Sequence, residues 1–244
     1  MNARTVSWAA PDDPEAAPGT GDGLRERKKR LMRQQLTDTA TELFLERGFD
    51  AVRVADVAAA CGVSEKTVFN YFPAKESLLL DRWDTTMASV RAGLADPGTA
   101  PVAAVTAILA GELGALTGWL AGQPDLEQAR GRMRRFGELI WSTPALRSHQ
   151  HDASGRLIAL AAELLAARAG MAPEDPEPQI AAMGLAGLWH VQAQSLRRHL
   201  AGTGSPGEIR EAVDADVRRA ARLLDTGLAA GWPGTGTGQR GGAG

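Results

Sequence analysis

Residues 54–72 read VADVAAACGVSEKTVFNYF, and this stretch decides the fold of the part of the chain around it. Its alanine-rich beginning suits a short helix, which Gly62 ends because glycine adopts left-handed backbone angles without steric cost. A second helix is expected from Ser64 to about Tyr71, because the Ser64 hydroxyl can cap the free amide of Thr67. Two short helices joined by a tight glycine turn are the sequence form of a helix-turn-helix.

Helical spacing assigns the two faces of this second helix. Val68 and Phe72 are four residues apart and should point into a core, whereas Lys66, Phe69 and Asn70 share the opposite face. A cation, an aromatic ring and an amide are side chains that bind phosphate, contact a thymine methyl group and read base edges. The outward face of the helix is therefore predicted to bind DNA.

The run GVSEKTVFNYFPAKESLL, residues 62–79, resembles the recognition-helix signature of the TetR family of bacterial transcription regulators. In that family a Gly-Val-Ser turn is followed by Thr, two aromatic residues, Phe and a Lys-Glu pair. The resemblance extends from about Leu24 to Leu80. The sequence departs from the family pattern at Arg53, where a Thr or Ser cap is usual, and at Phe69, where Tyr is common.

The resemblance implies a regulator that contacts DNA through its helix-turn-helix. Thr67, Tyr71 and Lys75 are placed to contact backbone phosphates beside the base-reading face. The complete set of residues predicted to bind DNA is Arg25, Lys28, Arg53, Ser64, Lys66, Thr67, Phe69, Asn70, Tyr71 and Lys75.

The basic residues are concentrated at one end of the chain. Between Leu24 and Arg33 six lysines and arginines stand against Glu26, a local charge of +5, whereas the whole chain of 244 residues carries −2. A solvated helix end and a DNA-binding surface both explain such a run. Its position just before the helix-turn-helix favours DNA, and binding through phosphates should weaken as salt rises.

Composition predicts an all-α protein. The chain is 44% hydrophobic, is rich in Ala, Leu, Arg and Glu, and has no alternating runs of β-branched residues. Its single cysteine excludes an internal disulfide and fits a reducing compartment. No signal peptide and no uncharged apolar stretch of about 18 residues occurs, so a soluble cytoplasmic protein without a membrane segment is expected.

The predicted domain organisation has four parts. They are a disordered leader at 1–23, a helix-turn-helix domain at 24–73, an effector-binding and dimerisation domain at 74–230, and a flexible tail at 231–244. After Pro73 one long helix is expected to link the helix-turn-helix domain to the C-terminal domain. Its buried face should carry Leu80, Trp83, Met87, Val90 and Leu94. Five further helices are predicted near 101–122, 125–141, 144–170, 177–201 and 206–230.

The last two predicted helices should form an antiparallel pair. Residues 180–191 are apolar almost all round, which predicts burial on more than one side. The TetR resemblance implies that this pair builds a homodimer interface, so that two helix-turn-helix domains bind the two halves of an inverted repeat. The residues predicted at that interface are Gly184, Gly187, Val191, Ile209, Val213, Val217, Ala220 and Leu224.

Large side chains in the C-terminal helices are either ordinary core or the lining of an effector cavity. The resemblance favours a small hydrophobic or amphipathic effector bound within the helical bundle. The candidates are Trp83, Met87, Trp119, Met133, Phe136, Trp141, Met183, Trp189 and His190. His190 can hydrogen-bond either a ligand or a neighbouring carbonyl group, and the sequence does not decide between them.

Motifs for other chemistry are weak. Gly202-Thr-Gly-Ser-Pro-Gly207 matches G-x-G-x-x-G, but it lies between two predicted helices and lacks the preceding strand that gives the motif meaning. His149 and His151 lie on different sides of a helix and have no metal-ligand spacing around them. Cys61 suits a small core position better than a redox sensor. No catalytic residue, metal or cofactor is therefore expected.

The sequence is best interpreted as a homodimeric TetR-type repressor that a small ligand releases from its operator. A transcription activator and a ligand-independent DNA-binding protein remain alternatives. An enzyme that uses the bundle as a catalytic pocket is a third alternative with little support.

Overall fold

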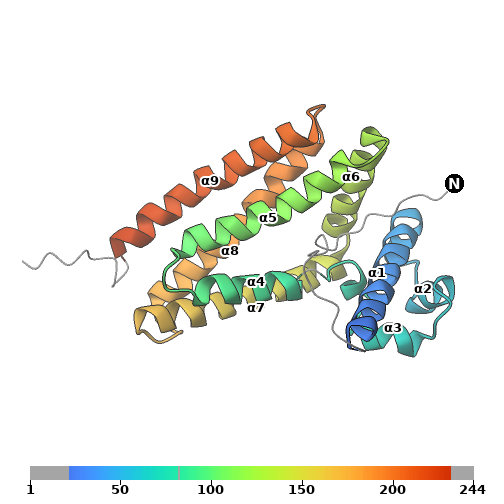
Figure 1. Cartoon of the computed structure of the whole chain (residues 1–244), viewed down its shortest axis with the longest axis horizontal. Coiled ribbons are helices and arrows are strands. Elements are labelled where there is room, and N and C mark those ends of the chain that lie inside the picture. Colours follow the sequence, from blue (N-terminus) through green and yellow to red (C-terminus); the bar gives the residue numbers. More distant parts are fainter. Residues whose placement is uncertain (1–21, 82, 232–244) are drawn as a thin grey trace, which may run out of the picture. The chain divides into compact units, whose positions relative to one another are not determined.

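The computed structural model describes residues 22–81 and 83–231, and every regular element in these ranges is helical (Figure 1). The expected all-α class is confirmed. The predicted leader, 1–23, and tail, 231–244, lie almost entirely outside the described residues. The elements are α1 (Asp22–Arg47), α2 (Val54–Ala60), α3 (Glu65–Tyr71), the 3-10 helix η1 (Glu76–Leu78), α4 (Trp83–Ala95), α5 (Pro101–Ala121), α6 (Leu126–Ser142), α7 (Pro144–Ala169), α8 (Pro176–Leu200) and α9 (Pro206–Gly231).

The five helices predicted after residue 100 begin and end within one residue of the observed ones. Four of them begin with proline, namely Pro101, Pro144, Pro176 and Pro206. Proline suits the first helical position because the N–H that it lacks would have no partner within the helix there. The first residues of these four helices could therefore be predicted from the sequence.

The chain forms two compact units. The first contains the described residues up to Trp83 together with Gly114–His151, and the second contains Asp84–Leu113 and the described residues from Asp152 onward. This division differs from the expected boundary between residues 73 and 74. The reason is that Phe136 and Leu139 of α6, with Leu146 of α7, pack against the core of the helix-turn-helix head.

The core of the head forms where α1, α2 and α3 meet. Leu36, Ala40 and Phe44 of α1 are each 1% exposed or less. Gly48 ends α1 with a φ of 84°, and Phe49 then folds back so that its ring centroid lies 5.0 Å from that of Phe44. The predicted glycine stop and its apolar cap are both confirmed.

The segment after Pro73 is not the single long helix that the sequence predicted. It forms η1, and α4 begins only at Trp83. Ser77, Leu78 and Leu79 are consecutive and all buried, at 8%, 0% and 6% exposed. One face of a straight α-helix cannot bury three neighbours in a row, so the chain turns here instead.

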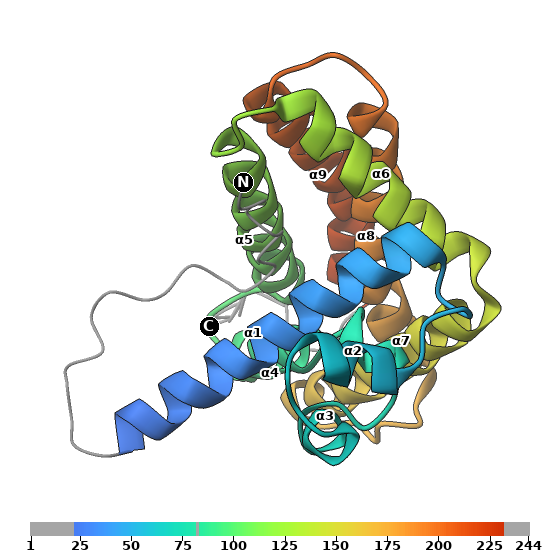
Figure 2. The same cartoon turned by 90° about the vertical axis from the view of Figure 1, so that its right-hand side faces the viewer.

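In the second unit α8 and α9 lie side by side (Figures 1 and 2). Ser195 contacts Asp216, and the backbone of Gly184 approaches Leu224, so residue numbers rise along one helix as they fall along the other. The predicted antiparallel pair is therefore confirmed.

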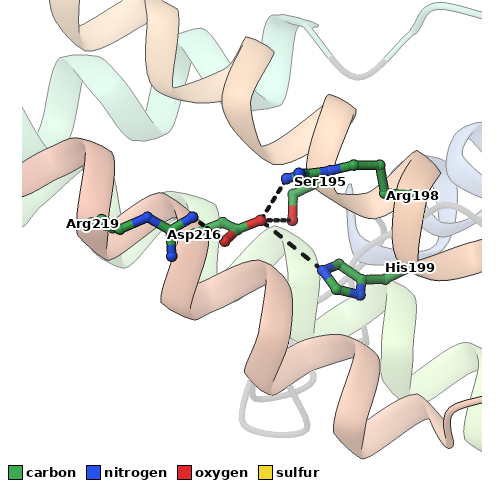
Figure 3. Close-up of polar contacts among 5 residues, drawn as sticks. All are labelled: Ser195, Arg198, His199, Asp216 and Arg219. Atoms are coloured by element: carbon green, nitrogen blue, oxygen red, sulfur yellow. Dashed lines mark hydrogen bonds and ion pairs between the residues drawn. The ribbon is translucent and has the colours of Figure 1, made fainter.

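Asp216 of α9 is the polar link between the two helices. Its carboxylate accepts hydrogen bonds from Ser195 Oγ at 2.7 Å, Arg198 Nη2 at 2.6 Å and Arg219 Nη2 at 2.6 Å, and His199 lies at 4.0 Å (Figure 3). The hydrogen bond from Ser195, followed by that from Arg219, holds the pKa of Asp216 below its ordinary value. Because Ser195 is fully buried, this contact fixes how the two helices pack along each other.

Several residues predicted at the dimer interface instead hold this pair together within one chain. Ile209, Val213 and Val217 are 2%, 0% and 3% exposed, so they offer no surface to a second chain. A Cβ atom on Gly184 would lie 2.8 Å from Leu224 Cδ2, which means that Gly184 serves the close approach of α9. The assignments of Ile209, Val213 and Val217 are corrected, and that of Gly184 stays a prediction.

One side of α8 is open to solvent. Ile180 and Met183 are 63% and 48% exposed, and Gly187 and His190 are also exposed. The expectation that residues 180–191 are buried on more than one side is wrong for the single chain. The apolar residues of this side remain uncovered.

A half-buried acidic pair of α1, Asp38 and Glu42, lies beside Arg132 of α6 in the first unit. Burial, followed by the charge of Glu42, raises the pKa of Asp38 from 3.8 to about 6, while Arg132 acts in the opposite direction. Arg132 Nη2 lies 3.4 Å from Glu42 Oε1, so the single arginine of this cluster is already committed to the neighbouring carboxylate.

Asp38→Asn should stabilise the protein at neutral pH. A raised pKa in the folded state means that the free energy of unfolding falls as pH rises from about 4 to about 6 and stays low above that. Removing the charge should therefore raise stability at about pH 7.5 by on the order of 1 kcal/mol, and by less at about pH 4.5. Urea unfolding at both pH values measures this, with exposed Asp50→Asn as the control. An equal change at both pH values would contradict the assignment.

Candidate nucleic-acid interface

The helix-turn-helix forms as the sequence predicted. Gly62 has a φ of 68° between α2 and α3. Ser64 caps α3, because its Oγ accepts a hydrogen bond from the Thr67 amide at 3.1 Å. Figure 2 shows α2 and α3 on the same side of α1. The turn presents α3 at the edge of the head.

The two faces of α3 are divided as expected. Val68 and Phe72 are each 1% exposed and belong to the head core. Lys66 and Asn70 are exposed, and the Phe69 ring is 49% exposed. About half of the Phe69 surface lies in solvent beside a lysine and an amide, which is typical of a residue that binds a partner.

Arg33 fastens α1 to the end of α3. Its Nη1 donates to the Tyr71 carbonyl at 3.0 Å, and its Nε donates to Asp81 Oδ2 at 2.6 Å, with a further ion pair from Nη2 to the same carboxylate. The guanidinium also lies over the Phe72 ring, 4.7 Å from its centroid. Sequence reasoning missed this clamp, because its partners are far apart along the chain.

The remaining candidates around α3 differ in how accessible they are. Arg53 is the N-cap of α2 and its backbone N–H donates to Asp56 Oδ2 at 2.8 Å, so its side chain, 81% exposed, is not needed for the cap. Arg25 and Lys28 are exposed on the first turns of α1. Tyr71 is partly buried against the head core.

Lys75 has a structural role that the sequence did not indicate. Its Nζ donates to the Phe49 carbonyl at 2.5 Å and lies 4.1 Å from the centroid of the Phe49 ring. It also lies 5.6 Å from the Phe44 ring. The ammonium group therefore holds the chain after α1 against the start of η1, and its phosphate contact remains a prediction.

The candidate effector residues divide between the two units. Those in the first unit are Trp83, Trp119, Met133, Phe136 and Trp141, and those in the second are Met87, Met183, Trp189 and His190. Phe136 packs on the head core, whereas Met183 and His190 lie on the exposed side of α8. Met183 and His190 therefore do not line an interior cavity of the single chain, which corrects their assignment.

A polar cluster inside the second unit was missed by sequence reasoning. Glu112 of α5 accepts hydrogen bonds from Thr86 Oγ1 of α4 at 2.7 Å and from Trp189 Nε1 of α8 at 3.1 Å. The available signal was Glu112 itself, the single charged residue in the apolar run 101–121. An ionisable group in such a run needs polar partners from neighbouring helices.

No alternative chemistry gains support from the described residues. In that part of the chain no group of three His, Cys, Asp or Glu side chains is placed to hold a metal ion. The loop at 202–207 follows a helix, and its Ser205 Oγ accepts a hydrogen bond from the Glu208 amide at 3.2 Å. This loop therefore begins α9 and lacks the strand that a nucleotide-binding loop requires.

Comparison with known proteins agrees with this geometry. The family model described as "Bacterial regulatory proteins, tetR family" matches residues 36–81, and the model described as "MftR C-terminal domain" matches residues 123–229. The HTH-type transcriptional regulator TcmR of Streptomyces glaucescens is 30% identical over 158 residues, covering 64% of this chain and 68% of TcmR. The putative mycofactocin biosynthesis transcriptional regulator MftR of Mycobacterium tuberculosis is 27% identical, covering 66% of this chain and 78% of MftR.

Among solved structures, native NalD of Pseudomonas aeruginosa has a similar fold, with a TM-score of 0.50 and 20% sequence identity. The match covers 82% of this chain and 97% of NalD. The chain belongs to the TetR family of bacterial regulatory proteins. It is a DNA-binding transcription regulator, with its helix-turn-helix in α2 and α3.

Phe69→Ala should weaken DNA binding without unfolding the head. Because the ring is 49% exposed, we expect a change of less than about 0.5 kcal/mol in the free energy of unfolding. Binding to a duplex selected from random DNA should weaken about tenfold, because the substitution removes an apolar contact with a base and a mismatched base pair costs about 1–3 kcal/mol. Phe72→Ala is the matched control, and it should destabilise the fold by about 3 kcal/mol. Unchanged affinity of Phe69→Ala would remove this residue from the interface.

Lys75→Ala should act first on the stability of the head. The substitution removes the hydrogen bond to Phe49 and the contacts with two rings, so we expect a loss of about 1–2 kcal/mol. Lys66→Ala should leave stability unchanged and weaken DNA binding, because Lys66 is exposed. Thermal unfolding and fluorescence anisotropy on the same two variants separate these effects. Equal melting temperatures for both variants would contradict the role given to Lys75.

Proposed function

We propose that this regulator is a repressor that binds an inverted-repeat operator as a homodimer and is released by a small hydrophobic or amphipathic molecule. The observation that carries the proposal is the outward face of α3, where Lys66, Phe69 and Asn70 are exposed while Val68 and Phe72 are buried. These three side chains match what a major groove offers, namely phosphates, a thymine methyl group and base edges. Ser64, Thr67 and Arg53 flank them as phosphate contacts.

The dimer is proposed to form through the open side of α8. Ile180, Met183 and Gly187 follow one another along this side, and Leu223 of α9 is 77% exposed. Val191, Ala220 and Leu224 are partly buried beside them. An uncovered apolar side on one helix, with a glycine that allows close approach, fits a self-complementary contact between two copies.

The effector is proposed to act through α4, the first helix after the head. Thr86 of α4 is 6% exposed and bonds to Glu112, which also bonds to Trp189. A ligand that prefers one arrangement of α4, α5 and α8 would shift the population away from the DNA-binding form. The effector candidates of the second unit at this cluster are Trp189, which belongs to it, and Met87, which follows Thr86 in the sequence.

The protein is proposed to work in the cytoplasm and to have no catalytic role. α5 is long and apolar enough to cross a membrane, with a mean hydropathy of 1.5 in its most apolar window. A core helix of a soluble protein passes the same test, and Glu112 in α5 bonds to two neighbouring helices, α4 and α8. Bacterial DNA regulators meet their target in the cytoplasm.

The experiment that tests the proposal is selection of bound duplexes from random DNA, followed by transcription assays. We expect an inverted repeat and reduced transcription from a promoter that carries it. Hydrophobic and amphipathic compounds that raise the melting temperature should also release the duplex. An increase in transcription would show an activator instead of a repressor. If the protein bound the duplex equally tightly with and without every stabilising compound, the proposed role of an effector would be wrong.

Met183→Glu should weaken the dimer. A carboxylate at this position would be buried without a partner in the proposed interface, which should raise the dissociation constant on the order of 100-fold. Ala159→Glu, at an exposed position on α7, changes the charge equally and is the control. Sedimentation equilibrium measures both variants. A dimer that withstands Met183→Glu would exclude this side of α8 as the interface.

A further inference from the structure

The beginning of α1 extends beyond the part of the chain that packs. Every residue from Gly23 to Leu31 is exposed, and Leu24 and Leu31 are 66% and 57% exposed. The family model starts only at residue 36, so this stretch lies outside the matched helix-turn-helix. In Figure 2 the first turns of α1, drawn in the darkest blue, stand clear of α2 and α3. We call residues 23–31 the α1 arm.

The arm carries a strong positive charge on exposed side chains. Arg25, Arg27, Lys28, Lys29 and Arg30 follow one another with Glu26 as the single acidic residue among them. Arg25 and Lys29 are four residues apart on one side of the helix, and like charges at this spacing destabilise an isolated helix. A polyanion placed along that side would remove the repulsion.

Arg33 marks the side of α1 that faces the end of α3. This residue bonds to the Tyr71 carbonyl at 3.0 Å and to Asp81, and it lies over the Phe72 ring. Lys29 and Arg25 stand one and two helical turns before Arg33, about 6 Å and 12 Å along the axis, near the same side of the helix. Arg27, two residues before Lys29, points to the opposite side.

We propose that the α1 arm binds the phosphate backbone of DNA flanking each half-site, with Lys29 and Arg25 as its contacts. The inference rests on the proposed DNA-binding face of α3 and extends the contacted DNA beyond it. A duplex that lies against the outward face of α3 continues past Tyr71, where α1 is fastened, and meets the side of the arm that carries these two residues. Arginine and lysine bind phosphates without regard to base sequence, so the flank contributes affinity and not specificity.

The test compares two duplexes in anisotropy titrations. One ends at the selected inverted repeat, and the other extends by about ten base pairs of arbitrary sequence on each side. For the unaltered protein the longer duplex should bind on the order of tenfold tighter, with a steeper dependence on salt. The double variant Arg25→Ala, Lys29→Ala should lose this gain, and its salt slope on the longer duplex should fall by about 2 per protomer.

Arg27→Glu is the matched control, because it also removes two units of positive charge but lies on the opposite side of the arm. It should keep the gain from the flanks. If both variants lost the gain from the flanks equally, the gain would come from the overall charge of the protein and not from a contact of the arm. That result would overturn the proposal. The absence of any gain from flanks in the unaltered protein would also overturn it while leaving the α3 interface intact. Failure to bind either duplex would instead contradict the proposed function itself.

Discussion

Burial of Val68 and Phe72 on one side of a seven-residue helix is the constraint on which the rest of the head depends. α3 is too short to be stable alone, so its orientation comes from its contacts with the core and not from its own propensity. The Ser64 cap sets where it begins, and the Arg33 clamp on Tyr71 and Asp81 fixes where it ends. With both ends and one face held, Lys66, Phe69 and Asn70 face outward together.

The sequence predicted those features that depend on neighbouring residues. Helix ends at a glycine, helix caps and helix starts at a proline are local signals, each with a physical cause. The structure contains all of those that were predicted: Gly48 and Gly62, the Ser64 cap, and the first residues of α5, α7, α8 and α9. Features that depend on residues far apart in the sequence were missed. The Arg33–Asp81 pair joins positions 48 residues apart, and the Glu112–Trp189 bond joins positions 77 apart. No spacing rule connects such residues.

The errors have the same origin. A helix starting soon after Pro73 is predicted because Leu80, Trp83, Met87, Val90 and Leu94 fit a helical period. Three consecutive residues before them, Ser77, Leu78 and Leu79, are buried instead. The apolar stripe of α9 was correctly identified and then assigned to the wrong partner, since Ile209, Val213 and Val217 pack on α8 of the same chain. Periodicity indicates that a face is buried, and it does not indicate what covers it.

The central claim is that the outward face of α3 touches DNA. The most direct measurement replaces Phe69 by a photo-crosslinking phenylalanine analogue and irradiates the protein with a duplex that it binds. The account predicts a covalent adduct to bases within the half-site, and none when the analogue stands at exposed Leu223 of α9. Tight binding of the duplex without any adduct at position 69 would contradict it.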